Sequence, residues 1–173
     1  MDDLIKGCAA NERLSQEKLY RLFYPGLILL CKRFFANDHE AIEVLNNGMM
    51  KVYRNINAFD GSKGTLFNWA YTIVRHAALD QLKKKRFPSM QQLDEHIELT
   101  TENTPELQIE SKAFYVLLDE LQEPGRAICS LFYVESFTVK EIAMQMNMQE
   151  GTVKWHLHQV RKKLKPVLEK YYG

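Results

Sequence analysis

Apolar residues recur every three or four positions along most of this chain, which is the spacing of the buried face of an α-helix. The pattern predicts helices over about 17–36, 39–57 and 66–85, and again over about 110–121 and 124–134. Alternation of apolar and polar residues between turn signals, which would mark half-buried strands, is absent from the sequence. We therefore expect an all-α protein.

Several residues should start or interrupt these helices. Pro25-Gly26 falls inside the first segment, and because proline lacks a backbone donor and glycine loosens the chain, we expect a kink or break there. Asp38 is placed to cap the second helix. Pro124 suits the first turn of its helix, where a missing donor is not needed. Two glycines within 59–65 indicate a loop before the third helix.

The same spacing predicts which faces are buried. In the second helix the buried stripe should contain Ile42, Leu45, Met49, Val52 and Ile56. In the third helix the inward residues should be Leu66, Trp69, Ala70, Ile73 and Ala77. A different face of the second helix carries a line at i+3/i+4 spacing, which we expect to be exposed: Glu43, Asn47, Met50 and Arg54.

The stretch 138–164 has the pattern of two short helices joined by a turn. Thr138 followed by Glu141 is a capping box, in which each side chain can satisfy a backbone donor at a helix start. Asn147 stands at the centre of the turn, and asparagine enters the left-handed region at little cost. The second helix should run over about 150–164. Such a helix-turn-helix places a helix in the DNA major groove, where base edges can be read.

Helix geometry divides that second helix into an apolar stripe and a polar face. At about 100° per residue, the stripe consists of Val153, Leu157, Val160 and Leu164. We expect Trp155, His158 and Gln159, on the opposite side, to face bases. The residues expected to hold phosphates are Thr152, Lys154, Arg161 and Lys162. An ordinary amphipathic surface helix is the alternative, but an exposed tryptophan among polar side chains favours binding.

The net charge of +1 over 173 residues hides a strong segregation of charge. Residues 61–87 contain six basic residues and one acidic residue, and residues 138–173 contain seven basic and three acidic residues. Residues 88–123 contain one basic and nine acidic residues. Two basic segments separated by an acidic one suggest two contacts with nucleic acid, although charge blocks that only maintain solubility are the alternative.

The same segregation indicates the domain organisation. Residues 88–108 are polar and acidic and lack a sustained period, so we interpret them as a flexible linker. The fold class predicted is two small helical domains, over 1–87 and 109–173, of which the second contains the helix-turn-helix.

No pattern in the sequence predicts catalysis, a cofactor or a metal site. The cysteines are scattered and form no C-x-x-C pair, so we expect no zinc site and no disulfide framework. His156 and His158 diverge by about 200° on a helix and cannot share one ion. Met1-Asp2-Asp3 does not start a signal peptide and no apolar run reaches membrane-spanning length. We expect a cytoplasmic protein that is not an enzyme.

Three blocks of the sequence, taken in order, resemble the extracytoplasmic-function sigma factors, the small two-domain subunits that direct bacterial RNA polymerase to promoters. Residues 41–54 resemble the polymerase-binding helix. Residues 59–86 resemble the segment that melts and reads the −10 element. Residues 141–164, which include Gly151-Thr152-Val153-Lys154, resemble the reader of the −35 element.

The resemblance implies roles for particular residues. The polymerase-binding residues would be Glu43, Asn46, Asn47, Met50, Lys51 and Arg54. The −10 contacts would be Asp60, Ser62, Lys63, Tyr71, Thr72, Arg75, His76 and Lys83. Within that set the 59–65 loop would capture a flipped base, and Tyr71 is a candidate stacking platform.

The chain departs from the family pattern at three places. Asn46-Asn47 stand where the family usually has glutamine followed by an acid, and Gly48 follows them, so the helix loses a charge and gains a residue of low helix propensity. His76 replaces a common asparagine, and Trp155 replaces a small polar residue. Both changes indicate an altered promoter preference.

The partners implied are core RNA polymerase, promoter DNA and an anti-sigma protein, with no membrane insertion. A helix-turn-helix regulator of the response-regulator type is an alternative, since its DNA-binding region also carries Gly-Thr-Val-Lys. The amino-terminal half, however, lacks the α/β pattern of a receiver domain. A helical adaptor that binds only protein is a third interpretation, and the basic segments argue against it.

Overall fold

The structure is a computed structural model that describes residues 2–86 and 118–172. Every secondary-structure element within these ranges is a helix, which confirms the prediction of an all-α protein. The chain divides into two compact units, Met1–Gln81 and Leu82–Gly173. The predicted linker 88–108 and most of the predicted helix 110–121 lie outside the described residues.

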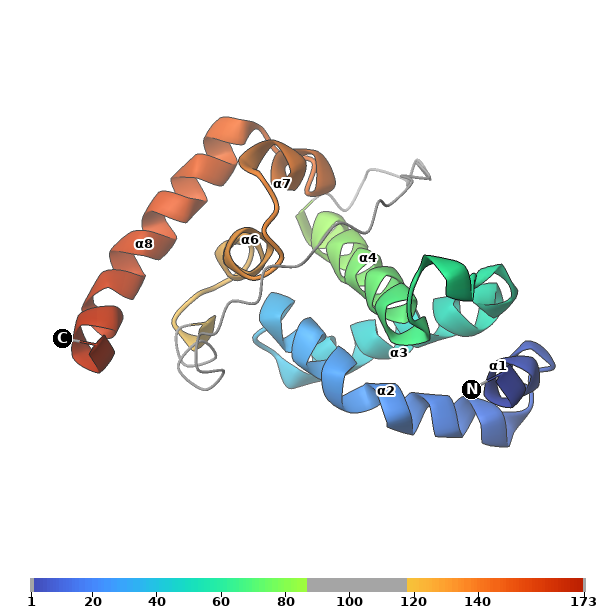
Figure 1. Cartoon of the computed structure of the whole chain (residues 1–173). Helices are drawn as coiled ribbons and strands as arrows, with labels where there is room; N and C mark the ends of the chain where they lie inside the picture. Colours follow the sequence, from blue (N-terminus) through green and yellow to red (C-terminus); the bar gives the residue numbers. More distant parts are fainter. Residues whose placement is uncertain (1, 87–117, 173) are drawn as a thin grey trace. The chain divides into compact units, whose positions relative to one another are not determined.

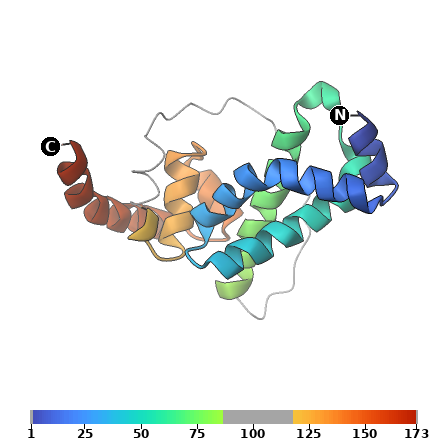
Figure 2. The same ribbon diagram turned by 90° about the horizontal axis from the view of Figure 1, so that it is seen from below.

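The first unit consists of packed helices with two short 3-10 turns. The elements are α1 (Asp2–Ala9), α2 (Arg13–Phe34), α3 (Asp38–Asn55), the turns Ile56–Ala58 and Gly61–Lys63, and α4 (Leu66–Arg86), whose residues from Leu82 on belong to the second unit. In both views α2 and α3 lie side by side, and α4 crosses them (Figure 1, Figure 2). The largest fully buried side chains of this core are Leu19, Leu27, Leu30, Phe34, Phe35, Leu45, Met49 and Ile56.

Helix α2 continues through Pro25, so a break is absent there, and the alternative expectation of a kink stays a prediction. Pro25 is exposed, and its neighbour Gly26 lies against α4. A Cβ atom at Gly26 would lie 2.6 Å from the Phe67 ring. Packing of α2 against α4 therefore outweighs the local tendency of this dipeptide to end a helix.

Helices α3 and α4 approach each other closely at a glycine. A Cβ atom on Gly48 would lie 2.8 Å from Cγ2 of Val74 and 3.0 Å from its Cα. Lys51 Nζ, one turn further along α3, lies 3.3 Å from Oδ2 of Asp80 on α4. The glycine that weakens α3 as an isolated helix therefore permits its packing on α4.

Three details of these helices differ from the sequence-based expectations. Asn37, rather than Asp38, caps α3, because its side chain accepts hydrogen bonds from the backbone N–H groups of His39 and Glu40 at 2.8 and 3.3 Å. Ile42 was expected in the buried stripe but is 38% exposed. Ile73 was expected inward but is half-buried, because α4 buries Val74 instead.

The second unit contains the predicted helix-turn-helix. It comprises α6 (Gly125–Tyr133), α7 (Val139–Gln145) and α8 (Glu150–Tyr172). The capping box is present: Glu141 N–H donates to Thr138 Oγ1 at 3.2 Å, and Thr138 N–H donates to Glu141 Oε2 at 2.7 Å. Asn147 has a φ of 49°, which confirms the left-handed turn. Helix α8 extends beyond its predicted end at Leu164 (Figure 1).

Candidate nucleic-acid and polymerase interface

The apolar stripe of α8 holds that helix on the rest of the second unit. Val153, Leu157 and Val160 are buried. The side chain of Leu164, the fourth predicted member, lies outside the described residues. Because one side of α8 is fixed in this way, the side chains of the opposite face are accessible in the isolated chain.

The face predicted to read DNA is largely exposed. Trp155 is 57% exposed. Of the other candidate contacts on α8, Lys154, His158, Arg161 and Lys162 are exposed, whereas Thr152 and Gln159 are half-buried. The helix therefore presents one large aromatic ring among cations and an amide, the residue types that contact bases and phosphates.

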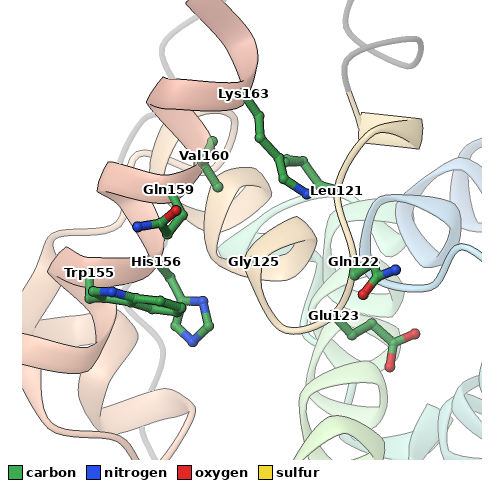
Figure 3. A pocket seen from close by; sticks show the side chains of 9 residues that line it. All are labelled: Leu121, Gln122, Glu123, Gly125, Trp155, His156, Gln159, Val160 and Lys163. Carbon is green, nitrogen blue, oxygen red and sulfur yellow. The ribbon is translucent and has the colours of Figure 1, made fainter.

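Trp155 and Gln159 line one side of a pocket of about 230 Å³ (Figure 3). The opposite side is formed by the segment before α6 and by Gly125, its first residue. The rings of Trp155 and His156 meet edge to face, with centroids 4.8 Å apart. This contact supports the exposed indole from one side and limits its rotation.

The guanidinium of Arg161 on α8 is held by a hydrogen bond to another helix. Its Nε donates a hydrogen bond to the Tyr133 hydroxyl at 3.0 Å. The bond raises the pKa of Arg161 above its usual value, so the guanidinium remains charged. Tyr133 lies at the end of α6, which makes this a link between two helices.

The loop before α4 has a defined conformation. The Asp60 carboxylate accepts hydrogen bonds from the N–H of Ser62 at 3.0 Å and from its hydroxyl at 2.7 Å, and these bonds lower the pKa of Asp60. Lys63 Nζ lies 3.9 Å from the other Asp60 oxygen. Gly64 has a φ of 145°, which favours glycine. The loop is thus exposed and ordered by its own side chains.

The predicted contacts on α4 are less accessible than those on α8. Tyr71, Thr72, His76 and Lys83 are all half-buried. The Tyr71 hydroxyl accepts a hydrogen bond from Arg33 at 3.3 Å, and the Thr72 hydroxyl donates to the Asn68 carbonyl at 3.0 Å.

Arg75 was expected on the DNA-contacting side of α4, and the structure corrects this. Its exposure is only 9%. Leu79 and Leu82 lie four and seven positions further along, hence on the same side of the helix, and both are buried. The buried stripe was predicted from the first half of α4, and in the second half the buried face lies on a different side of the helix.

The predicted polymerase surface occupies the outer face of α3. Glu43, Asn46, Asn47 and Arg54 are exposed, and Met50 is 50% exposed. Lys51 differs from the rest because it is half-buried and pairs with Asp80. Asn46 is held from α2 by the Tyr20 hydroxyl, which donates to Asn46 Oδ1 at 2.8 Å.

Sequence reasoning missed the residues that orient these side chains. Tyr20 and Tyr133 support Asn46 and Arg161 from other helices. Trp69 was expected inward, but it is half-buried and packs against Phe59 of the preceding loop, with ring centroids 5.7 Å apart. The pairs involving Tyr20 and Tyr133 are separated by 26 and 28 positions, which no helical periodicity reveals.

Comparison with known protein families identifies two matching regions. The model described as Sigma-70 region 2 matches residues 19–87, and that described as Sigma-70, region 4 matches residues 111–164. Within residues 2–86 and 118–172, no helix combines the length and apolar character needed to cross a membrane.

Several curated proteins are similar over most of the chain. The ECF RNA polymerase sigma factor SigW of Bacillus subtilis is 27% identical over 154 residues, which cover 80% of this chain and 81% of SigW. SigM of the same organism is 24% identical, over 86% of this chain and 92% of SigM. Among solved structures, the sigma factor RpoE in complex with the anti-sigma factor NepR from Bartonella quintana has a TM-score of 0.48 at 18% identity, covering 88% of this chain and 96% of that one.

Proposed function

Because this chain belongs to the extracytoplasmic-function sigma factors, we propose that it binds core RNA polymerase and directs it to specific promoters by reading −10 and −35 elements. The observation that carries this proposal is the order of the two matched regions. Region 2 covers residues 19–87 and region 4 covers residues 111–164. The protein is a transcription initiation factor, and we assign it no catalytic role of its own.

In this proposal each region has its own task. The domain over 1–87 binds polymerase and opened DNA, residues 88–108 form the linker, and the domain over 109–173 binds the −35 duplex. The exposed loop 59–65 supports capture of a flipped base, because its glycines allow backbone groups to approach closely. The protein acts in the cytoplasm, where its polymerase is, and an anti-sigma protein is a further proposed partner.

The −35 element is read by α8. We assign Trp155 and Gln159 to base contacts, since an apolar ring can meet a thymine methyl group and glutamine can pair with adenine through two hydrogen bonds. Lys154 and Lys162 are exposed, which supports our assignment of both to phosphate contacts. Replacing Gln159 with alanine should therefore change the preferred −35 base, whereas Lys154→Ala should weaken binding to all sequences and reduce the salt slope by about one unit.

The −10 contacts form a second set, around the start of α4. The loop contributes Asp60, Ser62 and Lys63, and α4 contributes Tyr71, Thr72, His76 and Lys83. Tyr71 is half-buried and its hydroxyl accepts a hydrogen bond from Arg33, so we assign it a stacking role only through the exposed part of its ring. Arg75 is left out of this set because it is buried.

The central test is transcription with purified components. The full chain is added to core polymerase with a library of promoter fragments that are randomised around −35 and −10. Transcripts that start at defined positions, and only when the chain is present, would support the function. A chain that neither joins core polymerase nor confers any preferred start would exclude it.

The polymerase surface on α3 is tested by charge reversal. Arg54→Glu should weaken binding to core polymerase, because it places an acid on the outer face of α3. Lys6→Glu is the matched control, since Lys6 is also exposed but lies outside the region 2 match. Equal retention of both variants on immobilised core polymerase would remove Arg54 from the interface.

A further inference from the structure

Tyr133 has a ring position that is set by the core of the second unit. The ring packs against the buried cluster formed by Leu118, Leu121, Cys129 and Val160. It also meets the Phe132 ring edge to face, with centroids 5.0 Å apart. A ring held on two sides has little freedom, so its hydroxyl oxygen occupies a defined position at the surface.

The hydroxyl of Tyr133 meets Arg161 at one particular nitrogen. Nε of Arg161 donates to it at 3.0 Å, although Arg161 itself is exposed. Arginine carries five N–H donors in a rigid plane. The bond uses the single donor on Nε and leaves the four donors of the two terminal nitrogens for another ligand.

Those terminal nitrogens form the fork that matches two oxygens of a phosphate. An unanchored arginine must lose most of its rotamer freedom to make this contact, whereas an arginine fixed at Nε has lost part of that freedom before binding. Arg161 also follows Val160, the buried residue that fixes this turn of α8. Both ends of the Arg161 side chain are thus constrained by the core.

We propose that Tyr133 is a positioning residue, which holds the Arg161 guanidinium in place for a two-point contact with a phosphate of the −35 duplex. This inference rests on the proposed function, in which α8 binds promoter DNA. Tyr133 itself supplies no base contact. Its loss should weaken binding without changing the preferred sequence, because phosphate contacts carry no direct sequence information.

The test measures affinity of the holoenzyme for a promoter duplex chosen by selection with that holoenzyme. Tyr133→Phe keeps the ring and removes the hydroxyl, so the second unit should melt at an unchanged temperature. The variant should bind about two- to tenfold more weakly, the range expected from ordering one long side chain. The preferred −35 sequence should be the same as for the parent chain.

A double-mutant comparison separates positioning from a direct contact. In an Arg161→Ala background, Tyr133→Phe should cost no further affinity, because there is no guanidinium left to orient. In a Lys162→Ala background the full two- to tenfold loss should persist, since Lys162 is an exposed cation at the next position. Arg161→Lys keeps the charge but lacks Nε, so it should also be insensitive to Tyr133→Phe.

The outcomes distinguish this inference from the proposed function. If the parent holoenzyme selects no −35 sequence, the proposed function fails. Suppose that the parent and Lys162→Ala chains bind as expected. The positioning role alone is then overturned if Tyr133→Phe does not weaken binding. It is also overturned if Tyr133→Phe weakens binding as much in the Arg161→Ala background as in the parent chain.

Discussion

Replacing Gly48 with alanine should destabilise the first unit, even though alanine is the better helix former. In an open helix this change would stabilise by about 1 kcal/mol. At Gly48, however, the new Cβ would lie 2.8 Å from Val74 Cγ2 and 3.0 Å from Val74 Cα. The Cγ2 atom can rotate away, but the Cα atom belongs to the α4 backbone, so α3 and α4 must move apart.

The size of the effect follows from these contacts. Carbon atoms rest at about 3.5–4.0 Å, and separating packed surfaces by about 0.5–1 Å forfeits a quarter to a half of each contact energy. Overpacking of this kind costs about 1–3 kcal/mol. With the helix-propensity gain of about 1 kcal/mol deducted, we expect a net loss of up to about 2 kcal/mol in the free energy of unfolding.

The two tryptophans allow each unit to be followed separately. Trp69 lies in the first unit and Trp155 in the second. In a Trp155→Phe background, urea unfolding monitored by tryptophan fluorescence reports on the first unit alone. Gly151→Ala is the matched control, because nothing lies within 4 Å of its added Cβ. Its unfolding is monitored by the fluorescence of Trp155 in a Trp69→Phe background. This substitution should be neutral or should stabilise the second unit by up to about 1 kcal/mol.

A second variant tests the stated cause. Val74→Ala removes the Cγ2 atom but leaves the Cα atom, so it should relieve only part of the cost of Gly48→Ala. An unfolding free energy for Gly48→Ala equal to or above that of the parent would refute the close-approach argument.

Three further predictions concern buried thiols, the cap and the turn. Burial raises the pKa of Cys31 and Cys129 to about 12. Because the thiolate is the reactive form, these thiols should react with Ellman's reagent at about pH 8 only after unfolding in urea. Prompt reaction of these thiols in the folded chain would contradict their burial. Hydrogen bonds from Thr138 lower the pKa of Glu141 below its usual value of 4.5, so the stabilisation is present above that value and is lost as the pH falls through the folded pKa. Glu141→Gln should therefore flatten the dependence of the melting temperature on pH below 4.5, and an unchanged slope would argue against the cap. Asn147 has a φ of 49°, so Asn147→Ala should cost about 1–2 kcal/mol while Asn147→Gly costs little, as measured by thermal melting; equal losses would contradict a backbone cause.

Local features were predictable because they depend on residues within one helical turn of each other. The capping box at Thr138 and the left-handed Asn147 were both expected and are present. The buried stripe of α8 was expected as well, and Val153, Leu157 and Val160 are buried. Periodicity of 3.6 residues and side-chain hydrogen bonds over three positions are properties of the chain itself.

Features that depend on a second helix could not be predicted in this way. Gly48 suggested a weakened α3, but its effect is decided by Val74 on the facing helix. Arg75 belonged to a polar face in the local pattern and is buried by its tertiary surroundings. The orientation of Arg161 depends on Tyr133, a residue of another helix. Sequence alone thus determined helices α2, α3, α4, α6, α7 and α8 and the family that they match, although it did not reveal α1. Only packing decided how closely the helices approach and which polar side chains face outward, because those outcomes depend on contacts between residues far apart in the chain.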